Sequence, residues 1–252
     1  MDDVIKGLFD LTKTLFDLEY KEILQPSVWQ VDVRMFEVYQ DKKLKGIFYL
    51  DLHPRANKYN HAACFSIING RLTPRGYQIP MASLVCNFPK ATSEKPALMP
   101  HSEVETFFHE FGHVLHQMLT TAELHAQSGT NVARDFVEAP SQIFENWAWD
   151  YEVLKNFSRH YKSGQVLPKP LFDKMRAAKK VGSGISATGQ VFLGTYDLTL
   201  HDQFDPNSGK TTTDVLRRVH NEVLPYPYQE GTYFQAAFGH LDGYGSSYYG
   251  YM

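Results

Sequence analysis

Two histidines and a glutamate form the most distinctive group of chemically active residues in the chain. In the segment FFHEFGHVLH, His109 and His113 are four positions apart, and Glu110 directly follows the first histidine. On a helix, residues four apart lie on one face, so both imidazoles can reach one ion. Zinc takes neutral imidazole ligands, and the intervening glutamate can remove a proton from a water molecule. The pattern is short and also occurs by chance. A catalytic zinc site needs a third protein ligand in addition to the two histidines.

The third ligand is sought downstream. His116 is close in sequence, but seven residues on a helix place it about 10 Å from His109 along the axis, too far to share one ion. Glu138 is the better candidate, because it lies on a second predicted helix that can pack antiparallel to the first. Two histidines and one glutamate leave the open fourth position that hydrolysis requires. Asp135 and Glu145, on the same segment, are either acceptors for a histidine N–H or solvated surface groups.

Strand-forming segments precede this motif and helical segments follow it. The alternation of β-formers predicts about four strands, at residues 28–40, 45–53, 60–68 and 81–88. The helical period predicts an amphipathic helix in the first twenty residues and further helices at 102–124, 135–161, 168–181, 183–204 and 212–224. Ser102 and Glu105 form a capping-box pattern at the start of the motif's helix.

A sheet followed by helices, without a convincing linker, predicts one α+β domain over residues 1–252 that is predominantly helical. Residues 28–88 would form its sheet part, and residues 102–252 the helical part that carries the metal site.

Composition argues against several other classes of function. The chain of 252 residues has a net charge of −3 and no basic run, which disfavours a nucleic-acid surface. No segment approaches the roughly 18 consecutive apolar residues of a membrane span, and the acidic N-terminus lacks the features of a signal peptide. Cys64 and Cys86 lie in apolar, strand-like surroundings without a CxxC pair. We therefore expect buried free thiols and a cytoplasmic location.

The segments HEFGHVLH and DFVEAPSQIFENWAWD together resemble the catalytic core of the thimet oligopeptidase family, zinc-dependent endopeptidases that act on short peptides. Other similar segments follow in family order along nearly the whole chain, among them KGIFYLDLHPRANKYNHAACFSI, SRHYKSG and FGHLDGYGSSYYGYM. Family members are usually far longer. The resemblance implies a zincin-like core without the large N-terminal helical region and without the C-terminal extension, either a natural minimal enzyme or a piece of a larger one.

The resemblance implies one Zn²⁺ per chain, held by His109, His113 and Glu138, with Glu110 as general base. It also implies that four ring residues near the C-terminus approach the substrate: His240, Tyr244, Tyr248 and Tyr251. A phenol O–H is a suitable donor to the oxyanion formed when water attacks a peptide carbonyl. Two glycines in the same loop, Gly243 and Gly245, would let the backbone come close to the substrate. Ordinary packing is the alternative interpretation of the tyrosines.

The leading hypothesis is a zinc-dependent metallo-endopeptidase or oligopeptidase that hydrolyses peptide bonds in short peptides by zinc-activated water. The alternative is a truncated core that binds zinc and peptide with little or no turnover. Peptides are the expected partners, with neither nucleic acid nor membrane, and the oligomeric state is left open. A substrate could pair with an edge strand, either 60–68 or 81–88.

Overall fold

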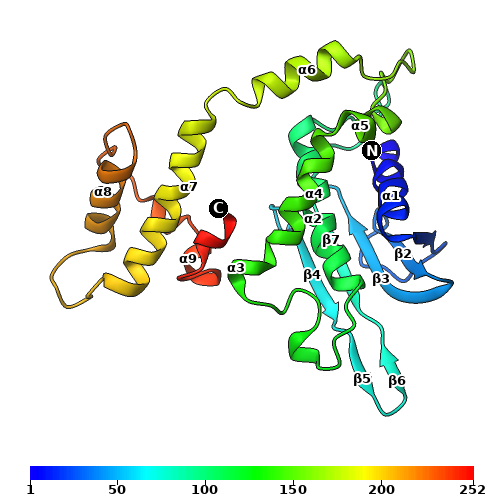
Figure 1. Ribbon diagram of the computed structural model, residues 1–252, viewed down its shortest axis with the longest axis horizontal. Coiled ribbons are helices and arrows are strands. Elements are labelled where there is room, and N and C mark those ends of the chain that lie inside the picture. The colour runs from blue at the N-terminus through cyan, green and yellow to red at the C-terminus, as the bar shows by residue number, and fades with distance from the viewer. The chain divides into compact units, whose positions relative to one another are not determined.

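The computed structural model describes all residues from 1 to 252, and the chain falls into two compact units. The first comprises Met1–Val132 and Ala139–Asp173, and the second comprises Ala133–Glu138 and Lys174–Met252. Figure 1 identifies the elements of each unit along the chain. No helix is both long and apolar enough to cross a bilayer. A single catalytic domain stays a prediction.

The first unit contains a five-stranded mixed sheet. Its strands follow one another in space as β1 (Leu18–Glu22), β2 (Arg34–Gln40), β3 (Lys43–Asp51), β7 (Met81–Val85) and β4 (Ala63–Ile68). All neighbours are antiparallel except β3 and β7, which are parallel. The short strands β5 (Arg71–Thr73) and β6 (Gly76–Gln78) form a separate hairpin. The sheet and the helices agree with the predicted α+β class. In this strand order, β4 is an edge strand.

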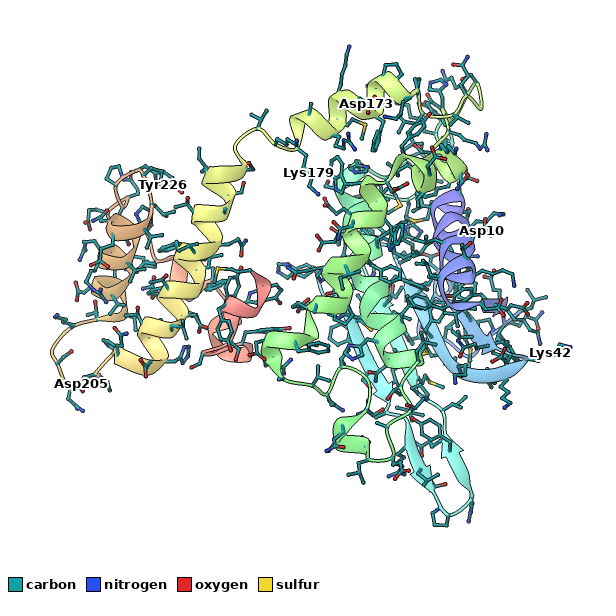
Figure 2. The ribbon with its side chains drawn as sticks, viewed as in Figure 1. Asp10, Lys42, Asp173, Lys179, Asp205 and Tyr226 are labelled. Carbon is teal, nitrogen blue, oxygen red and sulfur yellow. The ribbon has the colours of Figure 1, made fainter.

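Aromatic side chains join two helices to one face of this sheet. Phe48 on β3 is fully buried, and its ring centroid lies 6.3 Å from Phe9 on α1 (Asp2–Phe16) and 5.5 Å from Phe111 on α2 (His101–Met118). Figure 2 shows the side chains of these helices crowded against the strands. Phe111 belongs to the HEFGH motif, so the apolar core itself holds the motif's helix in place.

The predicted strands are confirmed in place, but some of their limits are wrong. The first begins only at Arg34, and two further pairings were not foreseen. The N-terminal helix stops at Asp17, which adopts left-handed φ, ψ angles of 54° and 40°, and the next five residues form β1. The segment expected to be a turn before β7 contains the β5–β6 hairpin, because Gly76 with φ 111° supplies its tight reversal.

The prediction of one long helix over residues 135–161 is wrong. The chain forms α3 (Arg134–Val137), α4 (Ala139–Glu145), a 3₁₀ turn (Asn146–Trp149) and α5 (Tyr151–Phe157). Asp150 has extended backbone angles and its side chain accepts the N–H of Val153, so it begins a new helix instead of continuing the old one. The predicted capping box is also absent, since α2 starts at His101 without a side-chain cap.

The remaining helices complete the chain. They are α6 (Lys169–Ala178), α7 (Ser183–Leu198), a π-helical turn (Thr199–Gln203), α8 (Thr212–Val223), α9 (His240–Gly243) and a final 3₁₀ turn, η5 (Tyr248–Tyr251). The second unit has its own small core, in which Tyr196 on α7 is buried beside Leu216 and Val219 on α8.

A buried charge network lies at the end of the sheet where β3 ends and β4 begins. The carboxylate of Asp51, at the end of β3, accepts hydrogen bonds from Arg55 at 2.7 and 2.8 Å and from Trp29 at 2.9 Å. Lys58, whose side chain is 3% exposed, lies 2.9 Å from Asp51 Oδ1 and donates to the carbonyls of Asp51, His53 and Cys86. Lys58 thereby ties the loop before β4 to the ends of β3 and β7.

The protonation of Asp51 follows from this network. Burial alone would raise the pKa of its carboxyl, but the hydrogen bonds from Arg55, Lys58 and Trp29 outweigh burial and hold the pKa at about 2, below the ordinary 3.8. Because the folded-state pKa is depressed, this stabilisation is fully present above the ordinary pKa and is lost as the pH falls through about 2.

We expect Lys58→Met to lower the free energy of unfolding by about 3 kcal/mol, because it leaves the Asp51 charge buried without its ammonium partner. Urea denaturation at neutral pH measures the change. The control is Lys90→Met, which removes a solvent-exposed ion pair with Asp32 and should leave the urea midpoint in place. Asp51→Asn in the Lys58→Met background should recover part of the loss; an unchanged midpoint in Lys58→Met would refute the role given to this network.

Candidate metal centre and tyrosine loop

The HEFGH motif lies in the middle of α2, where apolar anchors fix its rotation. Phe107, Phe108 and Phe111 are fully buried. The polar residues of the motif occupy the adjoining face, with the rings of His109 and His113 5.1 Å apart between centroids. The predicted one-turn relation between the two histidines is therefore present.

Gly112, inside the motif, allows α4 to approach α2 with almost no side chain between them. A Cβ atom at this position would lie 2.6 Å from Cα of Ser141 and 3.0 Å from the carbonyl oxygen of Pro140. Both of these neighbours are backbone atoms, so the clash could not be relieved by a rotamer change. The helices run antiparallel, since His109 meets Glu145 at one end of α4 and Gly112 meets Ser141 nearer its start.

Glu138 directly precedes α4 and completes a candidate group of metal-binding side chains. One carboxylate oxygen of Glu138, one ring nitrogen of His109 and one ring nitrogen of His113 all lie within 4.8 Å of one another. Glu138 is 3% exposed and His113 is 9% exposed. Two imidazoles and a carboxylate at this separation form a donor set that could hold a metal ion, whereas His116 does not belong to the group.

The ring of His109 is oriented by Glu145. Its Nδ1 lies 2.7 Å from Oε1 of Glu145, at the last position of α4. When Nδ1–H donates to this carboxylate, Nε2 is left without a proton and is the nitrogen available to a metal. Of the two carboxylates considered from the sequence, Glu145 takes this position. Asp135 instead accepts a 2.6 Å hydrogen bond from the hydroxyl of Tyr249.

Glu110 follows His109 on α2 and is 7% exposed. Its negative charge acts on the neighbouring strands: burial first, and then the charge of Glu110, raises the pKa of the thiols of Cys64 on β4 and Cys86 beyond β7. Both cysteines are free thiols, as predicted, although Cys64 is only partly buried.

Gln117, one turn beyond His113, links α2 to the edge strand. Its amide nitrogen donates to Oγ of Ser66 on β4 at 2.6 Å and to Oδ1 of Asn69 at 2.7 Å. Its amide oxygen accepts the backbone N–H of Thr130 at 3.0 Å. The side chain is almost completely buried, so β4 and the loop after α2 are both fixed to the motif's helix through one amide.

The C-terminal tyrosines divide into two groups. The hydroxyl of Tyr244 donates to Oε1 of Glu138 at 2.6 Å, and the guanidinium of Arg134 lies 5.1 Å from the centre of the Tyr244 ring. Burial, hydrogen bonding to Tyr244 and the charge of Glu138 together raise the pKa of Tyr251. Tyr244 and Tyr251 are therefore the two tyrosines beside the Glu138 carboxylate.

Tyr248 points elsewhere in this structure. It is 7% exposed, and its hydroxyl donates to the side-chain oxygen of Gln190 on α7 at 3.1 Å. The ring of His240 packs against Tyr244, Tyr248 and Tyr251 with centroid separations of 5.5, 5.3 and 5.5 Å. The four ring residues named from the sequence thus form one aromatic cluster, but only part of it reaches Glu138.

The two glycines of the loop have different surroundings. A Cβ at Gly243 would meet no atom within 4 Å, whereas one at Gly245 would lie 2.9 Å from Nε2 of His201. The space that Gly245 leaves open is thus used by a histidine of the π-helical turn.

Two residues that shape this region were missed in the sequence. Gln117 carries a signal, since a polar residue four positions after His113 on a helix shares its face. Asp197 accepts hydrogen bonds from the backbone of the tyrosine loop, residues 243–251. It carries no sequence signal, because its partners are 49 and 51 residues away in the chain.

The chain is similar to proteins of one known family. The model of peptidase family M3 matches residues 1–252. The chain is 41% identical over 256 residues to a thimet-like oligopeptidase of Dictyostelium discoideum, with 99% of this chain and 38% of that protein covered. It is 40% identical over 253 residues to oligopeptidase A of Escherichia coli K12 (98% and 37% covered), and 37% identical over 228 residues to the human mitochondrial intermediate peptidase (90% and 32% covered).

The chain thus spans less than two fifths of the length of these relatives. The family resemblance inferred from the sequence is confirmed along its whole length: the chain belongs to peptidase family M3.

Proposed function

We propose that the chain is the catalytic domain of a zinc-dependent oligopeptidase that hydrolyses peptide bonds in short peptides. The observation that carries the proposal is the group of His109, His113 and Glu138, whose ligand atoms lie within 4.8 Å of one another beside Glu110. Membership of the M3 family supports the same activity, and relatives named oligopeptidases support peptides as the substrate class. We place the activity in the cytoplasm, as the free thiols suggest.

The donor chemistry of the group fits zinc. Two neutral imidazoles and one carboxylate make up the three protein ligands of a catalytic zinc site and leave a fourth position open. Glu145 supports this arrangement because it fixes the tautomer of His109. One Zn²⁺ bound here would supply a Lewis acid that makes a water molecule more acidic and polarises the scissile carbonyl.

Glu110 is the proposed general base. In this mechanism its carboxylate takes a proton from the attacking water and passes it to the leaving amine, so the same group serves both halves of the reaction. The position supports the role, because Glu110 adjoins His109 on α2 and its side chain is buried.

The edge strand β4 is the proposed docking site for the substrate backbone. Of the two strands considered from the sequence, β7 is flanked by β3 and β4, which leaves its edges occupied, whereas β4 has a neighbour on one side only. Phe65 and Ile67 on β4 are 44% and 48% exposed. An extended peptide can add to such an edge through main-chain hydrogen bonds.

The aromatic cluster is proposed to complete the site. Tyr244 and Tyr251 lie at the Glu138 carboxylate, and one phenol O–H could donate to the oxyanion of the tetrahedral intermediate. His240 and Tyr248 belong to the same cluster and are proposed to approach the substrate with them. Gly243, which faces open space, is the glycine at which the backbone could come close to the peptide.

The first test is hydrolysis of a mixed peptide library and of one unfolded protein, followed by mass spectrometry with and without a chelator. We expect peptide cleavage that chelation abolishes and Zn²⁺ restores. Cleavage that persists after complete removal of metal would refute the zinc mechanism. A chain that holds one zinc ion but cuts nothing would instead be a binding core.

Glu110→Gln should retain zinc and lose nearly all turnover, because an amide cannot accept the proton of the attacking water. Zinc content and kcat are measured together. Glu123→Gln, the same change at an exposed position, is the matched control and should keep normal turnover. More than about a tenth of wild-type kcat in Glu110→Gln would exclude the general-base role.

Glu145→Ala should weaken zinc binding by roughly 10- to 100-fold, because His109 loses the acceptor that orients it. Competition with a chromophoric chelator measures the affinity without any assay of activity. Glu152→Ala, at an exposed position paired only with Lys155, should bind zinc as the wild type does. Equal affinities in all three proteins would show that Glu145 has no part in the site.

A further inference from the structure

The tyrosine loop, residues 243–251, has little regular structure of its own. It contains only the end of α9 and the short turn η5, and Ser246 adopts a positive φ of 63°. A positive φ is unfavourable for a residue with a side chain, so neighbouring groups must hold this conformation. The question is which groups outside the loop do so.

The carboxylate of Asp197 accepts two hydrogen bonds from the backbone of the tyrosine loop. Asp197 lies at the end of α7 and is completely buried. Its Oδ1 accepts the backbone N–H of Ser246 at 3.0 Å, and its Oδ2 accepts the backbone N–H of Tyr248 at 3.0 Å. A buried carboxylate is costly unless its oxygens are hydrogen-bonded, and charge-assisted bonds of this kind are strong. The two bonds hold the backbone across the strained residue.

His201 extends this anchor. Its Nδ1 lies 2.9 Å from Asp197 Oδ1 and 2.9 Å from the Asp197 carbonyl oxygen. The π-helical turn Thr199–Gln203 carries the imidazole, and such turns are rare and occur often at functional sites. Its Nε2 occupies the space that a Cβ at Gly245 would need, 2.9 Å away. The pair of Asp197 and His201 therefore lies against the loop at three positions, 245, 246 and 248.

We infer that Asp197 is the positioning residue of the tyrosine loop, and that through the loop it sets the hydroxyl of Tyr244 against the carboxylate of Glu138. The link is short: Tyr244 precedes the anchored segment directly, and its hydroxyl donates to Glu138 Oε1 at 2.6 Å. Packing alone does not require a charged group here. The backbone N–H groups of Ser246 and Tyr248 converge on one buried site, where the Asp197 carboxylate offers a separate acceptor oxygen to each. The consequence for turnover rests on the proposed function; the anchoring of the loop does not.

The direct test is amide hydrogen exchange in Asp197→Asn. The asparagine keeps the shape but has one acceptor oxygen, and its NH₂ group would face a backbone N–H. We expect exchange over residues 243–251 to become at least roughly tenfold faster, while α8 stays protected. The matched control is Asp205→Asn, which changes a carboxylate that also accepts a backbone N–H, from Asn207, but in the exposed loop before α8 labelled in Figure 2. It should leave the tyrosine loop unchanged.

Two results would overturn the inference: unchanged exchange over residues 243–251 in Asp197→Asn, or an equal loss of protection in α8, which would make Asp197 a general stability residue. Gly245→Ala is a second variant that disturbs the same contact from the loop side, since its Cβ would meet His201. It should accelerate exchange in the same residues and no others.

Kinetics supply the second readout. Asp197→Asn should lower kcat by up to about 10²-fold, as expected for misplaced site groups, with KM within roughly threefold of wild type. Adding Tyr244→Phe to Asp197→Asn should then cost much less than Tyr244→Phe costs alone, because the tyrosine is already misplaced. Fully multiplicative effects would refute the route through Tyr244. If the wild-type chain cuts no peptide, the exchange experiment still decides whether Asp197 positions the loop.

Discussion

The contact between the backbones of α2 and α4 at Gly112 is the constraint on which the proposed metal centre depends. Since the nearest atoms are Cα of Ser141 and the carbonyl of Pro140, the spacing of the helices is set by main chain and cannot adjust by side-chain rotation. Glu145 is the last residue of α4, so this spacing brings its carboxylate to His109 of α2, and Glu138 directly precedes the same helix. A methyl group at position 112 would clash with the backbone of α4 and move Glu145 away from His109.

Apolar packing and hydrogen bonding have different tasks in this chain. The cluster around Phe48 places α1 and α2 on the sheet, and such cores fix the positions of whole helices. Individual polar atoms are then placed by directed bonds: Glu145 to His109, Tyr244 to Glu138, and Gln117 to Ser66. Each of these bonds joins residues far apart in sequence. The proposed catalytic geometry needs this second level of order, because packing and hydrogen bonds together hold functional side chains in one rotamer.

The sequence predicted the elements better than their limits, and local chemistry better than distant chemistry. The one-turn spacing of His109 and His113 and the choice of Glu138 over His116 followed from helix geometry. The break at Asp150 was hidden because the surrounding residues keep a helical period, and a cap there competes successfully with continuation of the helix. Asp197 could not be found, because its role depends on backbone N–H groups about fifty residues further on, which any amino acid would supply.

The open edge of β4 exposes backbone and apolar side chains that another strand could pair with. Any strand with unpaired N–H and C=O groups and exposed apolar side chains can pair with a second copy of itself as readily as with a peptide. Phe65, Ile67 and Ile68 give β4 this character, and its register with β7 is interrupted between Ser66 and Ile68. Such an irregularity twists a strand and shortens the straight edge that another chain could extend. The irregularity is therefore of the kind that limits edge-to-edge pairing, and it lies on the same edge that is proposed to receive a peptide.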